Sequence, residues 1–226
     1  MTASGVDPFW ESTETVERFT GKEPDIRLQE LLDAFSNPGQ VCVLDVGCAA
    51  GRNTVMLAER GFDVFAIDGS EAMVARTRER VAGVLGREES ERRVRLGDME
   101  DLTSFADASV HVLVALGVLH QAATESQWTG AIREMSRCVA PGGRLLVAVW
   151  SPRSRPHGES VRLVAGEKHL YEGFHSGTHY LVEAPLLDSA LASAGFVPVV
   201  PTREVVVETD EGWRVTINAL YRRTES

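Results

Sequence analysis

Short apolar runs alternate along the chain with segments in which apolar residues recur every three or four positions. The runs predict buried strands over the ranges Val41–Val46, Asp63–Ile67, Val94–Leu96, His111–Ala115, Arg144–Trp150 and Phe196–Val200. The helically spaced segments predict helices between them, for example over Glu71–Leu85. This alternation is typical of a parallel sheet with helices on both faces.

The two ends of the chain do not follow this alternation. Residues 1–40 are largely polar with a helically spaced stretch from Leu28 to Phe35, and they predict an N-terminal helical arm or cap ahead of a domain over residues 41–226. Near the C-terminus, Glu204–Glu208 and Trp213–Tyr221 flank a turn sequence and predict a closing hairpin. The whole pattern predicts an α/β fold with a doubly wound, Rossmann-like, seven-stranded sheet, mostly parallel with one antiparallel strand near the C-terminus.

Two polar segments interrupt the pattern. Residues 151–178 are rich in Pro, Gly, Arg and His and follow a strand, so we expect a lid or substrate loop there. Their histidines, with His179, have no carboxylate or cysteine at a spacing known for metal sites, and we expect no metal. Arg87–Arg93 is read as a solvated, charged loop.

Composition narrows the class of partner. The 226 residues suit one α/β domain, and the net charge of −10 gives no general attraction for nucleic acid or for an anionic membrane. Three cysteines argue against a disulfide framework. With no signal peptide and no apolar run of about 18 residues, we expect a cytoplasmic protein.

The first strand leads into a glycine turn and then a helix, over Val41 to Asn53. This arrangement brings backbone N–H groups to one point at the carboxyl end of the sheet, where nucleotide-like ligands bind. A dinucleotide fingerprint would need glycine at positions 49 and 52, which are Ala and Arg. The spacing that fits is D-x-G-x-x-x-G, from Asp45, Gly47 and Gly51.

That spacing resembles motif I of the class I S-adenosylmethionine (SAM) dependent methyltransferases, which usually have a third glycine where Ala49 stands. A P-G-G turn before Arg144 and the segment Gly117 to Gln121 are also similar to the family. The G-R-N sequence after motif I and the two chain ends weakly resemble its tellurite-resistance branch. The resemblance implies SAM as cofactor and covers residues from Val41 to Tyr221.

Two acidic residues at strand ends extend the cofactor site. Asp68 lies about 20 residues past the glycine turn, where a carboxylate accepts hydrogen bonds from two ribose hydroxyls, while Ser70 is free to cap the next helix. The resemblance implies that Asp98 binds the adenine amino group and that Met99 lies against the ring. The expected cofactor-binding residues are Asp45, Gly47, Cys48, Ala49, Gly51, Asn53, Asp68, Gly69, Met73, Asp98, Met99, Glu100, Leu116 and Gly117.

The resemblance also implies that His120 lies near the transferred methyl group, where it would act as a catalytic base; a capping or core-edge histidine is the alternative. The expected acceptor pocket consists of Trp10, Phe19, His120, Gln121, Trp150 and Tyr180, although these aromatic residues also suit a packed core.

We therefore expect methyl transfer to a small-molecule acceptor, with no nucleic-acid or membrane partner. The alternatives are a protein that binds SAM without transferring methyl and a nicotinamide-dependent oxidoreductase. A nucleic-acid methyltransferase is disfavoured because no D-P-P-Y-like motif follows the fourth strand, where Ala115 to Val118 stand.

Overall fold

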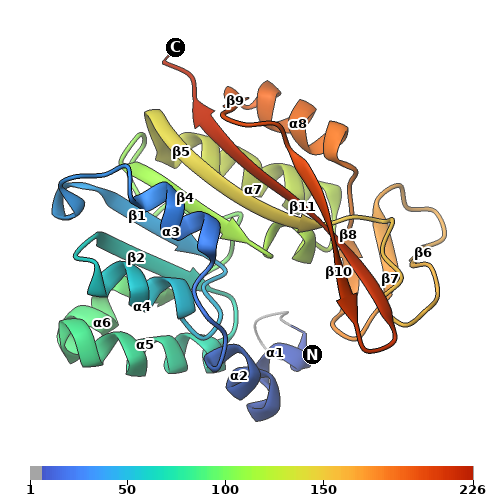
Figure 1. Ribbon diagram of the computed structural model, residues 1–226, viewed down its shortest axis with the longest axis horizontal. Helices are drawn as coiled ribbons and strands as arrows, with labels where there is room; N and C mark the ends of the chain where they lie inside the picture. The colour runs from blue at the N-terminus through green and yellow to red at the C-terminus, as the bar shows by residue number, and fades with distance from the viewer. Residues whose placement is uncertain (1–6, 226) are drawn as a thin grey trace.

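The computed structural model describes residues 7–225 and contains one large sheet. Its strand order is β3-β2-β1-β4-β5-β11-β10, and the short β9 pairs with the end of β11 (Figure 1). The strands are β1 (Cys42–Val46), β2 (Asp63–Asp68), β3 (Val94–Leu96), β4 (Val110–Leu116), β5 (Val139–Trp150), β9 (Phe196–Pro198), β10 (Arg203–Thr209) and β11 (Gly212–Arg223). Strands β1 to β5 are parallel and β11 runs antiparallel to its neighbours, which confirms the predicted Rossmann-like fold.

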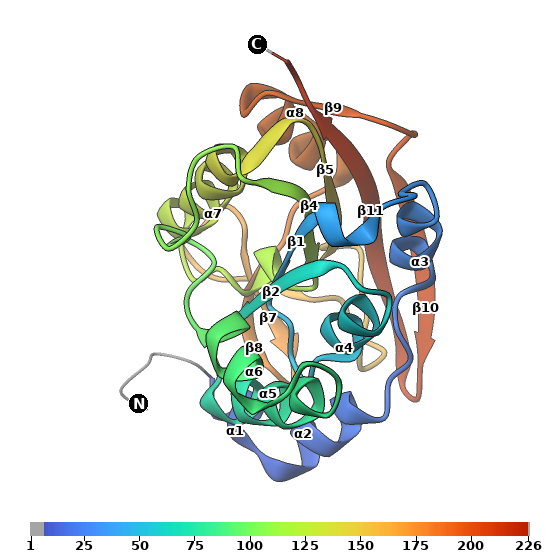
Figure 2. The ribbon, with the colours of Figure 1, turned by 90° about the vertical axis from the view of Figure 1, so that its left-hand side faces the viewer.

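Helices cover both faces of this sheet (Figures 1 and 2). One face packs against α7 (Glu125–Cys138) and α8 (Ala184–Ser193), and Trp128, Met135 and Leu191 are buried there. The other packs against α3 (Ile26–Leu32), α4 (Arg52–Glu59) and α5 (Glu71–Leu85), with Leu28 and Leu57 fully buried. No helix of the described residues is long and apolar enough to cross a bilayer.

The N-terminal residues form two short helices, α1 (Pro8–Glu11) and α2 (Thr13–Thr20), which lie beside the start of α5 (Figures 1 and 2). The carboxylate of Glu11 accepts hydrogen bonds from the backbone N–H groups of Glu71 and Ala72, and Ser70 donates to the carbonyl of Trp10. These contacts attach α1 to the start of α5. Residues 1–6 of the predicted arm lie outside the described residues.

The reading of Arg87–Arg93 as a loop is wrong, because the structure has helix α6 there. The helix has almost no apolar residues, so hydrophobic spacing gave no signal for it. Ion pairs one turn apart support it instead, from Arg87 to Glu91 and from Glu89 to Arg92 and Arg93. Glu88 and Glu89 lie in its first turn and Arg92 and Arg93 in its last, which also suits the helix dipole.

Residues 151–178, which were predicted to form a loop, contain regular secondary structure. They contain β6 (Arg162–Leu163) and β7 (Leu170–Phe174), which form a small antiparallel sheet with β8 (Gly177–Tyr180). Strand β5 also begins earlier than predicted, at Val139. An irregularity in its pairing with β4 accommodates the P-G-G sequence, where Gly142 has a φ of +76°.

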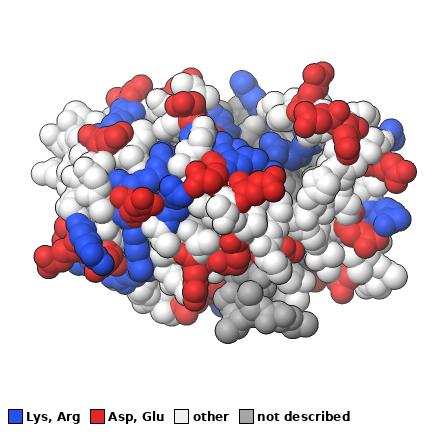
Figure 3. All heavy atoms as spheres, turned by 90° about the horizontal axis from the view of Figure 1, so that it is seen from below, with Lys and Arg blue, Asp and Glu red and all other residues white. Residues whose placement is uncertain are grey.

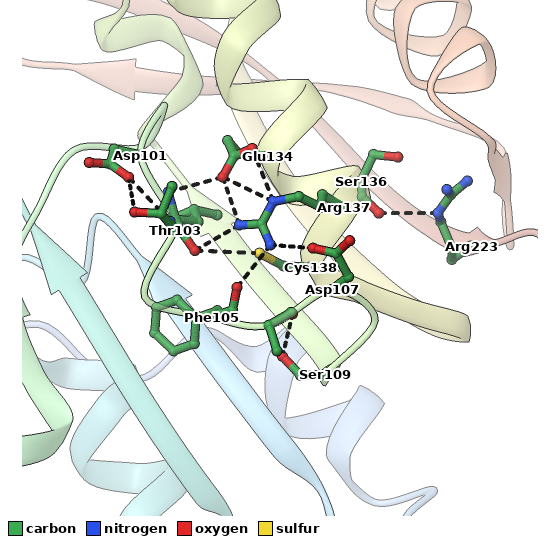
Figure 4. A network of polar contacts seen from close by, with 12 residues as sticks. Asp101, Thr103, Phe105, Asp107, Ser109, Glu134, Ser136, Arg137, Cys138 and Arg223 are labelled. Carbon is green, nitrogen blue, oxygen red and sulfur yellow. Dashed lines mark hydrogen bonds and ion pairs between the residues drawn. The ribbon is translucent and has the colours of Figure 1, made fainter.

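A polar network centred on Arg137 fixes the connection between β3 and β4 (Figure 4). Arg137 belongs to α7 and donates hydrogen bonds to the carbonyls of Leu102 and Phe105. Its guanidinium also pairs with Glu134 at 2.7 Å and with Asp107 at 2.7 Å. This connection follows the end of β3, so the network helps to hold the adjoining edge of the sheet.

Candidate active site

A cavity of about 820 Å³ opens at the carboxyl ends of the central strands. Its wall comes from the ends of β1, β2 and β4, from the β3–β4 connection, from β5 and β11, and from the N-terminal helices. Thirteen of the residues predicted from the sequence line this one cavity: Trp10, Phe19, Gly47, Ala49, Asp68, Gly69, Asp98, Met99, Leu116, Gly117, His120, Gln121 and Trp150.

The glycine turn after β1 forms one end of the cavity. Gly47 has a φ of +71°, and a Cβ atom there would lie 2.7 Å from Cβ of Val118. The position therefore requires glycine both for its conformation and for the close approach of Val118. Ala49, which replaces the family's third glycine, also adopts a positive φ of 48°.

Asp68 connects this turn to the end of β2. One carboxylate oxygen accepts a hydrogen bond from the N–H of Ala49 at 2.8 Å, and the other accepts from the N–H of Ser70 at 2.9 Å. Ser70 in turn caps α5 through its hydroxyl. Each carboxylate oxygen has a second lone pair, so Asp68 has capacity left for a diol in the cavity. Burial raises the pKa of Asp68 above its ordinary value.

Some predicted cofactor residues lie behind the cavity wall. Asp45 is fully buried and accepts a hydrogen bond from the hydroxyl of Thr54 at 2.7 Å, and burial raises its pKa to about 6. The side chain of Asn53 accepts a hydrogen bond from the N–H of Asp25 and so anchors the segment before α3. The structure places these groups in support of the turn, and their contact with a cofactor stays a prediction.

The other predicted residues outside the cavity lining are Cys48, Gly51, Met73, Glu100 and Tyr180. Tyr180 is buried and stacks on Trp128, with ring centroids 5.2 Å apart. It therefore packs in the core and does not line the cavity. Cys48 and Met73 are buried as well, Gly51 lies against Thr77, and Glu100 is exposed.

His120 lies in a cluster of rings around Trp150 of β5, which is three strands along the sheet order from β2, the strand that ends at Asp68. Its imidazole stacks on Trp150 with centroids 4.2 Å apart, and Trp150 stacks on Phe174 at 4.5 Å. Burial, together with His179 and Arg214, lowers the pKa of His120 well below its ordinary value. At neutral pH the imidazole is therefore uncharged, and it is a weak base. Phe174 brings the small sheet of β6–β8 against this ring cluster.

Strand β11 supplies a cavity wall that the sequence interpretation missed. Arg214, Thr216 and Asn218 line the cavity, whereas the alternate residues Val215 and Ile217 are buried in the core. Thr216 pairs directly with Trp150 of β5, which puts the three polar residues on the face that carries Trp150. The alternation of polar and apolar residues in this strand was visible in the sequence. The sequence did not show which face of the strand lines the cavity.

Unpartnered polar atoms gather in the wall of this cavity. Within the described residues, six buried side-chain N or O atoms have no hydrogen-bond partner. Four of these belong to residues that line the cavity: Nδ1 of His120, Nε2 of Gln121, Nε of Arg214 and Oγ1 of Thr216. Buried polar groups are normally satisfied, so this concentration indicates the place of a polar ligand.

The histidines of residues 151–178 do not gather with acidic or sulfur ligands. His179 is buried and hydrogen-bonds the hydroxyl of Ser176, and His175 lies against His157. In residues 7–225 no three His, Cys, Asp or Glu side chains are arranged to hold a metal ion.

Comparison with known proteins points to one enzyme family. Residues 43–143 match the family model described as a methyltransferase domain. A trans-aconitate 2-methyltransferase of Acidovorax sp. (strain JS42) is 28% identical over 144 residues, which are 61% of this chain and 49% of that protein. The chain thus spans about half the length of the curated relatives it matches.

Solved structures share the fold. A SAM-dependent methyltransferase of Methanosarcina mazei superposes with a TM-score of 0.71 at 17% identity, over 91% of this chain and all of that one. A Burkholderia thailandensis 1,6-didemethyltoxoflavin-N1-methyltransferase, solved with S-adenosylhomocysteine, gives 0.64 at 20% identity, over 93% of this chain and 83% of that one. The domain match shows a methyltransferase domain over residues 43–143, and the glycine turn and the fold are similar to those of the class I SAM-dependent methyltransferases.

Proposed function

We propose that the protein transfers a methyl group from SAM to a small-molecule acceptor. The observation that carries this proposal is the division of the cavity into two ends. One end has the glycine turn and Asp68, and the other has the unpartnered polar groups beside Trp150. Ligand cavities range from about 300 to 1,000 Å³. A volume of about 820 Å³ is near the upper end of that range and suits two ligands.

The residues at the first end fit the cofactor. Gly47 and Ala49 of the turn line the cavity beside Asp68, which has free lone pairs for the ribose hydroxyls. Asp98 and Met99 line the same end, where we expect them to meet the adenine. When bound, SAM supplies an electrophilic methyl group for in-line displacement by the acceptor.

At the second end the protein's task is mainly to orient the acceptor. Holding two reactants in line can lower a barrier by about 7–11 kcal/mol. Trp150 offers a flat surface, and Gln121 and Thr216 offer hydrogen bonds. The uncharged His120 can take a proton from an acceptor that releases one in the reaction, although its lowered pKa makes it a weak base.

A small acceptor is also supported by the enclosure of the site and by its charge. Residues of α1, α2 and the small sheet line the cavity together with the main sheet, which leaves limited space for a macromolecule. On the face seen from below, basic and acidic side chains are interspersed (Figure 3). Two of the similar proteins are named as methyltransferases of small molecules, trans-aconitate in one case and 1,6-didemethyltoxoflavin in the other.

The test is an assay with methyl-labelled SAM on small acceptors and macromolecules side by side. The small panel contains carboxylates, thiols, phenols, amines and metalloid oxyanions, and the macromolecules are total RNA, DNA and a histone-like protein. Label should pass to at least one small class. Labelling of a macromolecule with every small class silent would overturn the proposal. SAM binding without transfer to any acceptor would favour the alternative of a binding protein.

A further inference from the structure

Three basic side chains, Lys22, Arg52 and Arg214, line the cavity without an acidic ion-pair partner in residues 7–225, and Arg52 donates instead to the carbonyl of Glu23. Arg214 and Lys22 make no ion pair with any carboxylate of residues 7–225, whereas Arg27, which also lines the cavity, pairs with Asp25. The Nε of Arg214 is buried and has no hydrogen-bond acceptor. An unpaired charged group in a partly buried site is costly, so a negatively charged ligand is the natural complement.

Aromatic rings and further positive charges surround Arg214 and Lys22. The guanidinium carbon of Arg214 lies 5.2 Å from the ring centroid of Trp150. Lys22 is exposed to solvent, and its Nζ atom lies 4.0 Å from the ring centroid of Phe19. Burial and the charges of Arg52, Arg214 and Arg18 lower the pKa of Lys22 to about 8, and burial lowers that of Arg214.

The four carboxylates that line the same cavity do not pair with these two cations. Asp25 pairs with Arg27, and Asp68 accepts from backbone N–H groups at the cofactor end. Asp7 accepts a hydrogen bond from the N–H of Phe9 and caps α1. Asp98 follows β3. None of the four forms an ion pair with Arg214 or Lys22 within the described chain, so both cations remain available to a ligand.

A second cavity of about 410 Å³ adjoins the first at this point. Trp10, Phe19, Lys22, Trp150, Ser176 and Arg214 line both cavities. Phe9 and Phe174 line the second one together with polar residues that include Arg18, Asp210 and Glu211, and Glu211 pairs with His157, so the space beyond the cations has aromatic surfaces on part of its wall. The arrangement suits a molecule with one charged group held by Arg214 and an uncharged body against the rings.

We propose that the methyl acceptor is a small organic acid whose carboxylate binds Arg214, with Lys22 beside it, and whose uncharged part lies against Trp150. This rests on the proposed function, because it names the class of acceptor for the same site. The guanidinium offers a planar fork of donors that matches a carboxylate, and Gln121 adds another unpartnered donor at the cavity. The competing role for these cations is to hold the carboxylate of the cofactor itself.

The test compares acids with their uncharged amides. Benzoate and benzamide, and phenylacetate and phenylacetamide, are titrated into the protein by calorimetry at pH 7, with and without saturating S-adenosylhomocysteine. We expect each acid to bind at least about tenfold more tightly than its amide, as a charge-assisted contact predicts. In Arg214→Met this preference should disappear, in Arg214→Lys part of it should remain, and Lys22→Met should reduce it.

Arg222→Met is the matched control, because Arg222 lies on β11 but outside both cavities. It should leave the preference for acids unchanged. Equal binding of acid and amide by the native protein, including no binding of either, overturns the proposal. It is also overturned if Arg214→Met weakens S-adenosylhomocysteine while the acid preference persists. If the native protein does not bind S-adenosylhomocysteine, the proposed function is refuted instead. Titration of acid and amide in the absence of S-adenosylhomocysteine still tests the role of Arg214.

Discussion

Replacing the buried carboxylate of motif I should make stability less dependent on pH. Asp45 is fully buried, and its carboxylate accepts one side-chain hydrogen bond, from Thr54. Burial raises its pKa from 3.8 to about 6. The folded state therefore holds the proton more tightly than the unfolded state, and the ionised carboxylate destabilises the fold above pH 6. This destabilisation is lost as the pH falls toward 3.8.

The size of the effect follows from the pKa difference. About two pKa units correspond to about 3 kcal/mol in the free energy of unfolding at pH 7.5, and about 1 kcal/mol of this remains at pH 4.5. In Asp45→Asn the group does not titrate. The stability difference between variant and native protein should therefore be about 2 kcal/mol more favourable to the variant at pH 7.5 than at pH 4.5.

Urea unfolding of both proteins at the two pH values measures this difference. A new amide donor at position 45 adds a cost that does not depend on pH, so it cancels when the two differences are compared. Thr54→Val is a useful companion, since removal of the hydroxyl that donates to the carboxylate should raise the pKa of Asp45 further. A variant-minus-native difference that is the same at both pH values would refute the reasoning.

Three further predictions concern the turn, the base and the small sheet. Gly47→Ala should destabilise the protein by about 2–4 kcal/mol, because the alanine would have to adopt a left-handed conformation and would also clash with Val118. Gly61 has a φ of +79° but open space around it, so Gly61→Ala should cost only about 1–2 kcal/mol. Equal costs for the two variants in urea unfolding would count against the close approach of Val118 to Gly47. Since the pKa of His120 is lowered, protonation of His120 should not reduce kcat/KM between pH 8 and pH 6.5. A fall in kcat/KM toward low pH within that range in the native protein, absent from His120→Gln, would contradict this. Shortening residues 151–178 should alter acceptor turnover with SAM affinity preserved, and an unfolded product by circular dichroism would show that the segment is structural instead.

The sequence predicted the fold, and it predicted that the glycine turn and Asp68 come together, because both depend on local patterns. The buried run ending at Asp45 and Val46, followed by Gly47, has to be a strand that turns sharply, and Asp68 ends the next strand at the same edge. Parallel pairing of β1 with β2 then brings Asp68 to the turn without further information.

The acceptor end was predicted less completely because it depends on long-range pairing. Arg214 and Thr216 reach the cavity only because β11 pairs with β5 in a register that sets Thr216 beside Trp150. Lys22 precedes α3 and carries no motif of its own. Tyr180 was assigned to the pocket from its type and position, but it stacks on Trp128 in the core.

The most direct test of the central claim is a calorimetric titration of S-adenosylhomocysteine into the native protein and into Asp68→Ala, with NADH as the competing ligand. Asp68 offers two carboxylate oxygens at the cofactor end, so loss of two charge-assisted hydrogen bonds should weaken binding by about 2–3 kcal/mol. Urea unfolding of the variant is needed alongside, since Asp68 also holds Ala49 and Ser70. The account predicts one site for S-adenosylhomocysteine, weakened in a folded Asp68→Ala, and no binding of NADH. Unchanged affinity in that variant, or tighter binding of NADH than of S-adenosylhomocysteine, would contradict it.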